Sequence, residues 1–433
     1  MQRKRLITLF KLLPEGVQEK ILRVGIFKGM VRVVVLRRFW IRRLKSRLQT
    51  PKSIKRYLRE ETVYWVDPKK IVYTTKKEFN IYEYQGRVIG GNWDRLERKF
   101  NEIDFYISYE RRASEGRDWE ELPYYKRVLG QIEAGIPKWG CYSKKELDRR
   151  CELLDKVFES IKRNGYRSQL YVEKGQGKDR LLGVIDEVTV NIGRYGDLLF
   201  NNGRHRLTFA KLCGIENIPV RITVRHAEWE EFKKEVEMYA RRHHGKVYAP
   251  LTHIDLRSIP SHYSDERFEI IKSHMGKGNH TLLDIGAHWG YFCQKFEEEG
   301  FHCTAVEYDE ESLYFLRKLK RAGNSKFKVV PASVFDLVRG GPLKYDVVLA
   351  LAVFHHFLKE DSAFGKLKLL LNALHVKEMY FEPNLPREPQ MRGAFISFST
   401  EEFVDFILNN SCLNEQKVVG KCEDGRLLYK LWR

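Results

Sequence analysis

The stretch "TLLDIGAHWGYF", residues 281–292, is typical of a strand that enters a tight turn and then a helix. Gly286 lets the chain turn without a Cβ, and Gly290 lets the backbone approach a ligand where the helix begins. His288 and Trp289 occupy the turn, where a dinucleotide fingerprint carries another glycine, and they leave less room for a pyrophosphate. The stretch therefore predicts a loop for a smaller cofactor that carries no phosphate.

Strands and helices alternate on the carboxyl-terminal side of this stretch. We expect helices at 291–300, 310–323 and 364–374, a closing edge strand at 425–433, and strands at 281–286, 302–309, 326–337, 345–357 and 378–383. This alternation predicts an α/β fold with a parallel sheet covered on both faces, whose first strands end at one ligand-binding edge. Glu307 ends the second strand, where a carboxylate can accept hydrogen bonds from a ribose diol.

Four segments in this region resemble, in order and spacing, the motifs of class I SAM-dependent methyltransferases. "LLDIGAHWGYF" is similar to their first motif and "AVEYD" (305–309) to the second. "PASVFDL" (331–337) is similar to the adenine-contacting motif, and "DVVLALAVFHHF" (346–357) to the fourth. The resemblance covers 262–433 and implies a Rossmann-like sheet, methyltransferase activity and S-adenosyl-L-methionine (SAM) as cofactor.

The same resemblance implies the residues of the site. The cofactor-binding residues it implies are Asp284, Gly286, His288, Gly290, Tyr291, Glu307, Tyr308, Ser333, Val334 and Leu351. The family often has an acid where Ser333 stands, and Asp336 is the alternative nearby. His355 and His356 follow the fourth strand, so they are the candidate catalytic bases for a hydroxyl acceptor, or else they only shape the pocket.

Residues 201–226, "NNGRHRLTFAKLCGIENIPVRITVRH", predict a turn at 201–203, a helix that ends at Gly214 and a strand at 218–224. Arg204, His205 and Arg206 fall at the start of that helix, where free backbone N–H groups and the helix dipole favour an anion.

This unit resembles the ParB/sulfiredoxin-like superfamily over 185–225. The resemblance implies an α+β domain that binds phosphate or a nucleotide through Gly203, Arg204, His205 and Arg206. The redox activity of that superfamily needs a cysteine, which this sequence lacks at the corresponding place. The alternative is that the arginines only cap the helix and pair locally.

Residues 1–60 form a basic arm that holds 18 Lys or Arg residues and three Glu, so +15 of the net charge of +20 lies there. Its longest apolar run, "VVVL" at 33–36, is far shorter than the ~20 residues that span a bilayer. Apolar residues between the charges predict an amphipathic helical arm. Three interpretations stay open: contact with an anionic membrane surface, a helical extension packed on the protein, or nucleic-acid binding.

The sequence thus divides into the arm (1–60), a ParB/sulfiredoxin-like domain (61–247) and a methyltransferase domain (262–433). Seven scattered cysteines without C-x-x-C spacing predict neither a disulfide framework nor a metal site, and they suit a cytoplasmic protein. We expect methyl transfer to a small-molecule or lipid-linked acceptor that carries phosphate or a glycan, with membrane association through the arm. The alternative is a nucleic-acid-binding protein whose methyltransferase domain modifies RNA or DNA.

Overall fold

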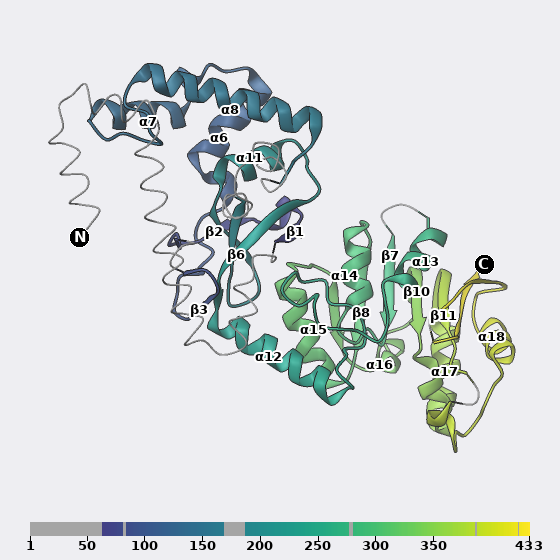
Figure 1. Ribbon diagram of the computed structural model, residues 1–433. Coiled ribbons are helices and arrows are strands. Elements are labelled where there is room, and N and C mark those ends of the chain that lie inside the picture. The colour runs from purple at the N-terminus through teal and green to yellow at the C-terminus, as the bar shows by residue number, and fades with distance from the viewer. Residues whose placement is uncertain (1–62, 81–83, 169–186, 277–279, 386–387, 423) are drawn as a thin grey trace. The chain divides into compact units, whose positions relative to one another are not determined.

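A computed structural model of the protein describes residues 63–80, 84–168, 187–276, 280–385, 388–422 and 424–433 (Figure 1). The chain forms two compact units. The first unit contains the described residues up to 193 together with 198–227, and the second contains 194–197 together with the described residues from 228 to 433. The basic arm predicted at 1–60 lies outside the described residues. No helix within the described ranges is long and apolar enough to cross a membrane.

The first unit is built on a mixed sheet with the strand order β1-β6-β4-β5-β2, in which β3 also pairs with β6. Its strands are β1 (Tyr64–Val66), β2 (Tyr73–Thr74), β3 (Arg87–Ile89), β4 (Val188–Ile192), β5 (Leu198–Asn202) and β6 (Ile218–His226). All residues of β4 and β6 are buried, as expected for the centre of a sheet.

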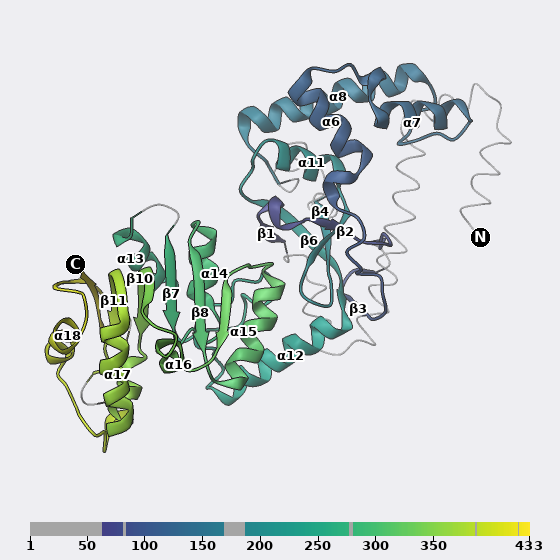
Figure 2. The ribbon, with the colours of Figure 1, turned by 180° about the vertical axis from the view of Figure 1, so that it is seen from behind.

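Helices of the first unit pack around an aromatic core. They are α6 (Asp104–Glu115), α7 (Pro123–Glu133), α8 (Lys144–Asn164) and α11 (Arg204–Leu212), with short 3-10 turns at Pro68–Lys70, Phe100–Glu102 and Trp119–Glu121. Phe105, Tyr109, Tyr124 and Phe209 join α6, α7 and α11 in one cluster. Figure 2 shows α6, α7, α8 and α11 gathered at one end of the sheet.

The turn predicted at 201–203 is wrong in its first two residues, because Asn201 and Asn202 belong to β5. Asn201 can lie in a buried strand because its amide is fully engaged: Oδ1 accepts from the Phe79 N–H at 2.8 Å and Nδ2 donates to Thr189 at 3.0 Å. The turn therefore consists of Gly203 alone, whose φ of 97° leads directly into α11.

The second unit contains the predicted parallel sheet, with the strand order β12-β13-β11-β10-β7-β8-β9. Its strands are β7 (Thr281–Ile285), β8 (His302–Glu307), β9 (Lys328–Pro331), β10 (Leu343–Leu351), β11 (Leu374–Glu382), β12 (Glu415–Lys421) and β13 (Leu427–Trp432). β7 to β11 run parallel, and β13 is antiparallel to both β11 and β12. Chain order reverses on either side of β7, which makes its carboxyl end a switch point where such sheets bind ligands.

Helices cover both faces of this sheet (Figures 1 and 2). Leu283 and Ile285 of β7 face the core formed with α17 and α18, whereas Leu282 faces the core formed with α13 and α14. This alternation of buried side chains is what a sheet covered on both sides requires. The helices are α12 (Ala227–Arg242), α13 (Glu266–His274), α14 (Tyr291–Glu298), α15 (Glu310–Ala322), α16 (Val334–Val338), α17 (Asp361–Ala373) and α18 (Thr400–Asn409).

Two predicted strands end six residues earlier than expected, and the strand predicted at 302–309 ends at Glu307. The strand predicted at 326–337 ends at Pro331, because the Ser333 side chain accepts a hydrogen bond from the Phe335 N–H and begins α16. The strand predicted at 345–357 ends at Leu351. The next residue, Ala352, has a φ of 51°, and a 3-10 helix follows at Phe354–Leu358.

The closing edge strand predicted at 425–433 is wrong in its position. β13 lies between β11 and β12, and the edge on this side is β12, whose residues are half-buried or exposed. In the second unit, α12 packs on α15 through Phe232 and Phe315, although the sequence interpretation placed α12 in the middle domain.

Candidate cofactor and acceptor site

A pocket of about 510 Å³ opens at the carboxyl ends of β7, β8 and β10. All predicted cofactor residues except Gly290 line it. Of the two predicted bases, His356 lines the pocket and His355 does not. The topology of the sheet therefore brings together side chains that are spread over 110 positions of the sequence, from Tyr248 to Phe357.

The two glycines of the loop have different roles. Gly286 has a φ of 72°, and a Cβ there would lie 2.9 Å from Cγ2 of Val353 at the opposite wall of the pocket. Gly290 has a φ of 77° and begins α14, and its Cβ would lie 3.1 Å from the ring of Phe327 in the core. Gly286 thus keeps the pocket open, whereas Gly290 permits close packing behind it.

His288 also has a left-handed backbone, with a φ of 50°. Histidine and asparagine tolerate this conformation better than most residues, which explains how His288 can replace the asparagine common in the family. Burial lowers the pKa of His288 to about 4, so its imidazole is neutral at pH 7. Trp289 stacks on Phe315 of α15, with ring centres 4.3 Å apart, and fills the space beside the loop.

Glu307 is fixed by backbone N–H groups at the end of β8. Its Oε2 accepts from the N–H of His288 at 2.8 Å. Its Oε1 accepts from the N–H groups of Tyr308 and Asp309 at 2.8 and 2.9 Å. A carboxylate has about four acceptor positions, so Oε2 retains capacity for a ligand hydroxyl.

Asp284 lies at the end of β7 and is 3% exposed. Burial raises the pKa of Asp284 to about 7, and the nearby Glu307 raises it further, while Cys293 and Arg267 act in the opposite direction. The acid can therefore hold or release a proton near neutrality, or keep its charge when a cationic ligand binds beside it.

Ser333 lines the pocket, and its hydroxyl caps α16. Asp336, the alternative acid, is not among the residues that line the pocket; it forms an ion pair with Arg339 at 3.5 Å. The pocket wall at this point consequently presents a hydroxyl and not a carboxylate.

His355 and His356 lie side by side, with ring centres 4.1 Å apart. His355 is 3% exposed, and burial together with His356 and Arg426 lowers its pKa to about 3. Burial and Lys359 lower the pKa of His356 to a smaller extent. Because a weaker base accepts a proton less readily, His356 at the pocket wall is the better placed of the two for proton transfer.

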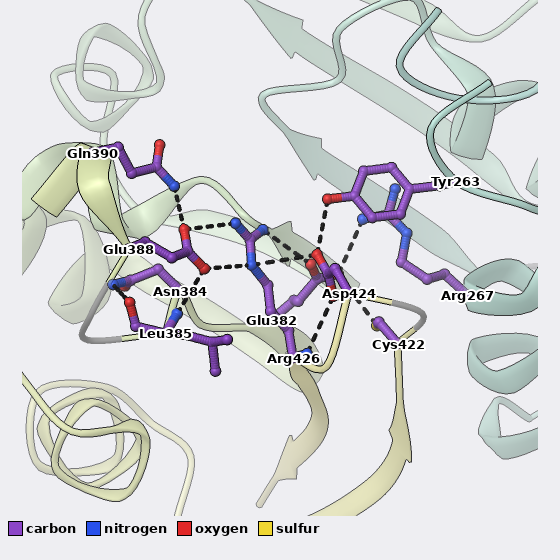
Figure 3. Close-up of polar contacts among 10 residues, drawn as sticks. All are labelled: Tyr263, Arg267, Glu382, Asn384, Leu385, Glu388, Gln390, Cys422, Asp424 and Arg426. Carbon is purple, nitrogen blue, oxygen red and sulfur yellow. Dashed lines mark hydrogen bonds and ion pairs between the residues drawn. The ribbon is translucent and has the colours of Figure 1, made fainter. Parts of the chain in front are cut away.

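Sequence patterns gave no signal for a buried charged network beside the pocket (Figure 3). Glu382, fully buried at the end of β11, accepts hydrogen bonds from Arg267 at 3.0 Å and from Arg426 at 3.3 Å. Arg426 also bonds Glu388 through Nε and Nη2, at 2.9 and 2.8 Å. Cys422 and Asp424 lie close enough to Glu382 to form a metal-ligand set, but both Glu382 oxygens already serve the arginines.

The residues of the predicted phosphate site in the first unit differ in their surroundings and in their hydrogen bonds. His205 is enclosed by Phe105 and Trp139, its Nε2 lies 3.4 Å from the Tyr124 hydroxyl, and burial lowers its pKa to about 3. Gly203 donates its N–H to Asn202 at 2.6 Å. Arg204 and Arg206 are half-buried and each further lowers the pKa of His205 by its charge.

Comparisons with known proteins bear on the second unit. Residues 283–373 match the family model described as a methyltransferase domain. The second unit is a SAM-dependent methyltransferase. No curated protein matches the chain in sequence.

Solved structures similar to the chain include the bifunctional kinase-methyltransferase WbdD, with 15% identity and a TM-score of 0.37 over 43% of this chain and 44% of that chain. A SAM-dependent methyltransferase from Archaeoglobus fulgidus has 18% identity and a TM-score of 0.30 over 39% and 90%. A protein from Pyrococcus horikoshii OT3 has 15% identity and a TM-score of 0.31 over 39% and 88%. The chain thus spans less than half the length of WbdD, and these values say nothing about its substrate.

The pocket of the methyltransferase fits its cofactor. Gly286 provides a backbone cradle that a Cβ would fill, Glu307 retains an acceptor for a ribose hydroxyl, and Tyr308 offers an exposed ring beside it. When bound, SAM would supply a methyl group whose carbon bonds to the acceptor as its bond to the sulfonium sulfur breaks, with the neutral thioether as the leaving group. The protein's part would be to bind, orient and desolvate the reactants, and His356 at the pocket wall is the candidate to take up a proton when the acceptor is a hydroxyl.

Proposed function

We propose that the protein transfers a methyl group from SAM to a phosphate-bearing acceptor, either a small molecule or a lipid-linked glycan. In this proposal the first unit is a ParB/sulfiredoxin-like domain that binds the phosphate group or a nucleotide. The observation that carries it is a set of three arginines around His205, two of which have a buried N–H without an acceptor among the described residues.

Arg150, Arg204 and Arg206 all lower the pKa of His205 by their charge. Arg150 Nε and Arg206 Nη1 are buried and have no hydrogen-bond acceptor among the described residues. Buried donors of a charged group are costly to leave unsatisfied, so an anion with several oxygens would complete the cluster.

Two further features support a phosphate ligand. Arg204 and Arg206 lie in the first turn of α11, where the helix dipole favours negative charge. Trp139 is 40% exposed beside them, stacks on Tyr124 and lies under the guanidinium of Arg150. An exposed aromatic ring next to a cationic cluster suits a nucleotide, whose base can stack while its phosphate binds the arginines.

Binding of the full chain to inorganic phosphate, a sugar phosphate and a nucleotide, measured by calorimetry, tests this assignment. Arg206→Met should lower the affinity for the ligand at least tenfold, because one charge-assisted hydrogen bond is worth about 1.5–3 kcal/mol. Arg111→Met, an exposed arginine on α6 of the same unit, is the matched control and should bind like the unchanged protein. Equal binding by both variants contradicts the phosphate site.

The acceptor class is tested separately by transfer of a labelled methyl group from SAM into a cell extract. We expect label in phosphate-bearing metabolites or in the lipid-linked glycan fraction, and none with a Glu307→Ala variant. The basic arm motivates a companion measurement, co-sedimentation with anionic vesicles, since 18 basic residues favour an anionic surface. Label in RNA or DNA, together with nucleic-acid affinity that falls steeply with salt, would replace this proposal by the nucleic-acid alternative.

A further inference from the structure

Arg267 is the one lysine or arginine among the described residues that line the cofactor pocket. Three carboxylates line the same pocket: Asp284, Glu307 and Asp309. SAM carries two cationic groups, its sulfonium and its ammonium, and a single carboxylate. The acids suit the two cations, but a carboxylate that enters a buried site is costly unless it meets a cation.

Histidines at the pocket wall do not supply that cation. Burial lowers the pKa of His288 to about 4, and burial and Lys359 lower the pKa of His356. Both imidazoles are therefore neutral at pH 7. The positive charge at the wall at this pH comes from Arg267 alone among the described lining residues.

The Arg267 guanidinium is held in place from two sides (Figure 3). Its carbon lies 3.7 Å from the ring centre of Tyr263, close enough for stacking and a cation–π interaction. Its Nη1 donates to Oε2 of Glu382 at 3.0 Å. Arg267 is 3% exposed, so it has little freedom to move away from the pocket.

Arg267 nevertheless has hydrogen-bonding capacity to spare. A guanidinium has five N–H donors, and Nε of Arg267 is buried without an acceptor in the described part of the chain. Glu382 divides its charge between Arg267 and Arg426, whereas Arg426 has Glu388 and Asp424 as further partners. Arg267 is thus the less neutralised of the two arginines.

We propose that Arg267 binds the carboxylate of the cofactor's amino-acid end, with Glu382 as the residue that positions the guanidinium. The proposal rests on SAM being the cofactor. It means that Arg267 makes the pocket prefer ligands that carry a carboxylate. The part of SAM that does not react is then recognised by a residue of α13, outside the four sequence motifs.

The test compares two ligands by calorimetry on the full chain: S-adenosylhomocysteine and its decarboxylated analogue, which keeps the adenosine, the sulfur and the amine. The unchanged protein should bind S-adenosylhomocysteine roughly 10- to 150-fold more tightly, the range for one charge-assisted hydrogen bond. In the double variant Arg267→Met/Glu382→Gln, which leaves no unpaired charge at this pair, the two ligands should bind within about twofold of each other.

Arg339→Met, whose arginine side chain is 83% exposed, is the control and should discriminate like the unchanged protein. Circular dichroism establishes folding, and Arg267→Lys replaces the double variant if that variant does not fold; it should lose most of the discrimination. Equal binding of both ligands by the unchanged protein, or full discrimination in the Arg267 variant, overturns the proposal while SAM stays the cofactor. Absence of any binding of S-adenosylhomocysteine overturns the cofactor assignment itself.

Discussion

Oε2 of Glu307 accepts a hydrogen bond from the backbone N–H of His288 at 2.8 Å, across 19 residues of sequence. This contact ties the end of β8 to the loop after β7, which lies within the predicted first motif. One wall of the pocket is therefore fixed by the protein before any ligand binds. Glu307 therefore supports the loop, and we expect it to bind the ribose hydroxyls of the cofactor as well.

Replacement of Glu307 by alanine should abolish measurable binding of S-adenosylhomocysteine and also destabilise the protein. Three backbone N–H groups lose their acceptor, at a cost of about 1–3 kcal/mol for the buried donors. Calorimetry gives the affinity, and urea unfolding gives the stability. Glu310→Ala, an exposed acid in the first turn of α15, is the control. Unchanged affinity in Glu307→Ala would remove this residue from the cofactor site.

Substitutions of His288 should separate backbone conformation from side-chain chemistry. His288→Asn should keep the affinity for SAM within a few-fold, because asparagine tolerates a φ of 50°. His288→Val should destabilise the protein by about 1–2 kcal/mol, since a β-branched residue is strained there. Thermal unfolding and calorimetry measure both effects. Complete loss of SAM binding in His288→Asn would mean that the imidazole itself contacts the cofactor.

A methyl group at Gly286 should close the pocket. Gly286→Ala places a Cβ 2.9 Å from Val353, and the affinity for S-adenosylhomocysteine should fall at least tenfold. Gly300→Ala is a matched control, because Gly300 also has a positive φ, 91°, but its Cβ would have no neighbour within 4 Å. Both variants should lose a similar amount of stability from backbone strain, and only Gly286→Ala should lose affinity. A loss of affinity in both would point to general destabilisation.

Asp284 should make stability fall as pH rises. Its pKa is raised to about 7 in the folded protein, against about 3.9 when unfolded, so between these values the folded state binds the extra proton. The destabilising contribution is absent below pH 4 and complete above pH 7. Buried histidines with a lowered pKa make stability rise with pH over part of the same range. The effect of Asp284 is therefore measured as the difference in stability between a variant and the unchanged protein.

The stability of Asp284→Asn relative to the unchanged protein should therefore increase steadily from pH 4.5 to pH 7.5. Urea unfolding at intermediate pH values gives this difference directly. A difference that does not change with pH over this interval would show that Asp284 has an ordinary pKa.

Much of the second unit could be predicted because the sequence signals for its turns, strands and helices lie within short stretches of the chain. Gly286 and Gly290 mark the turn, alternating apolar runs mark β7 and β8, and helix α14 follows at once. Boundaries failed where a single side chain decided them. The Ser333 cap ends the strand predicted at 326–337, and the amide bonds of Asn201 let β5 continue through residues that are typical of turns.

The sequence by itself predicted the five parallel strands, the helices α14, α15 and α17 between them, the glycine-bearing loop after β7 and the acid at the end of β8, because these depend on residues within a few turns of one another; it did not predict α13, α16, α18 or β12. Tertiary structure alone decided which strands are neighbours and which charges are buried. Arg267 and Glu382 are 115 residues apart and meet only because the tertiary fold brings α13 to the carboxyl end of β11. Burial in that packing, and not residue type, separates His355 from the pocket wall and raises the pKa of Asp284.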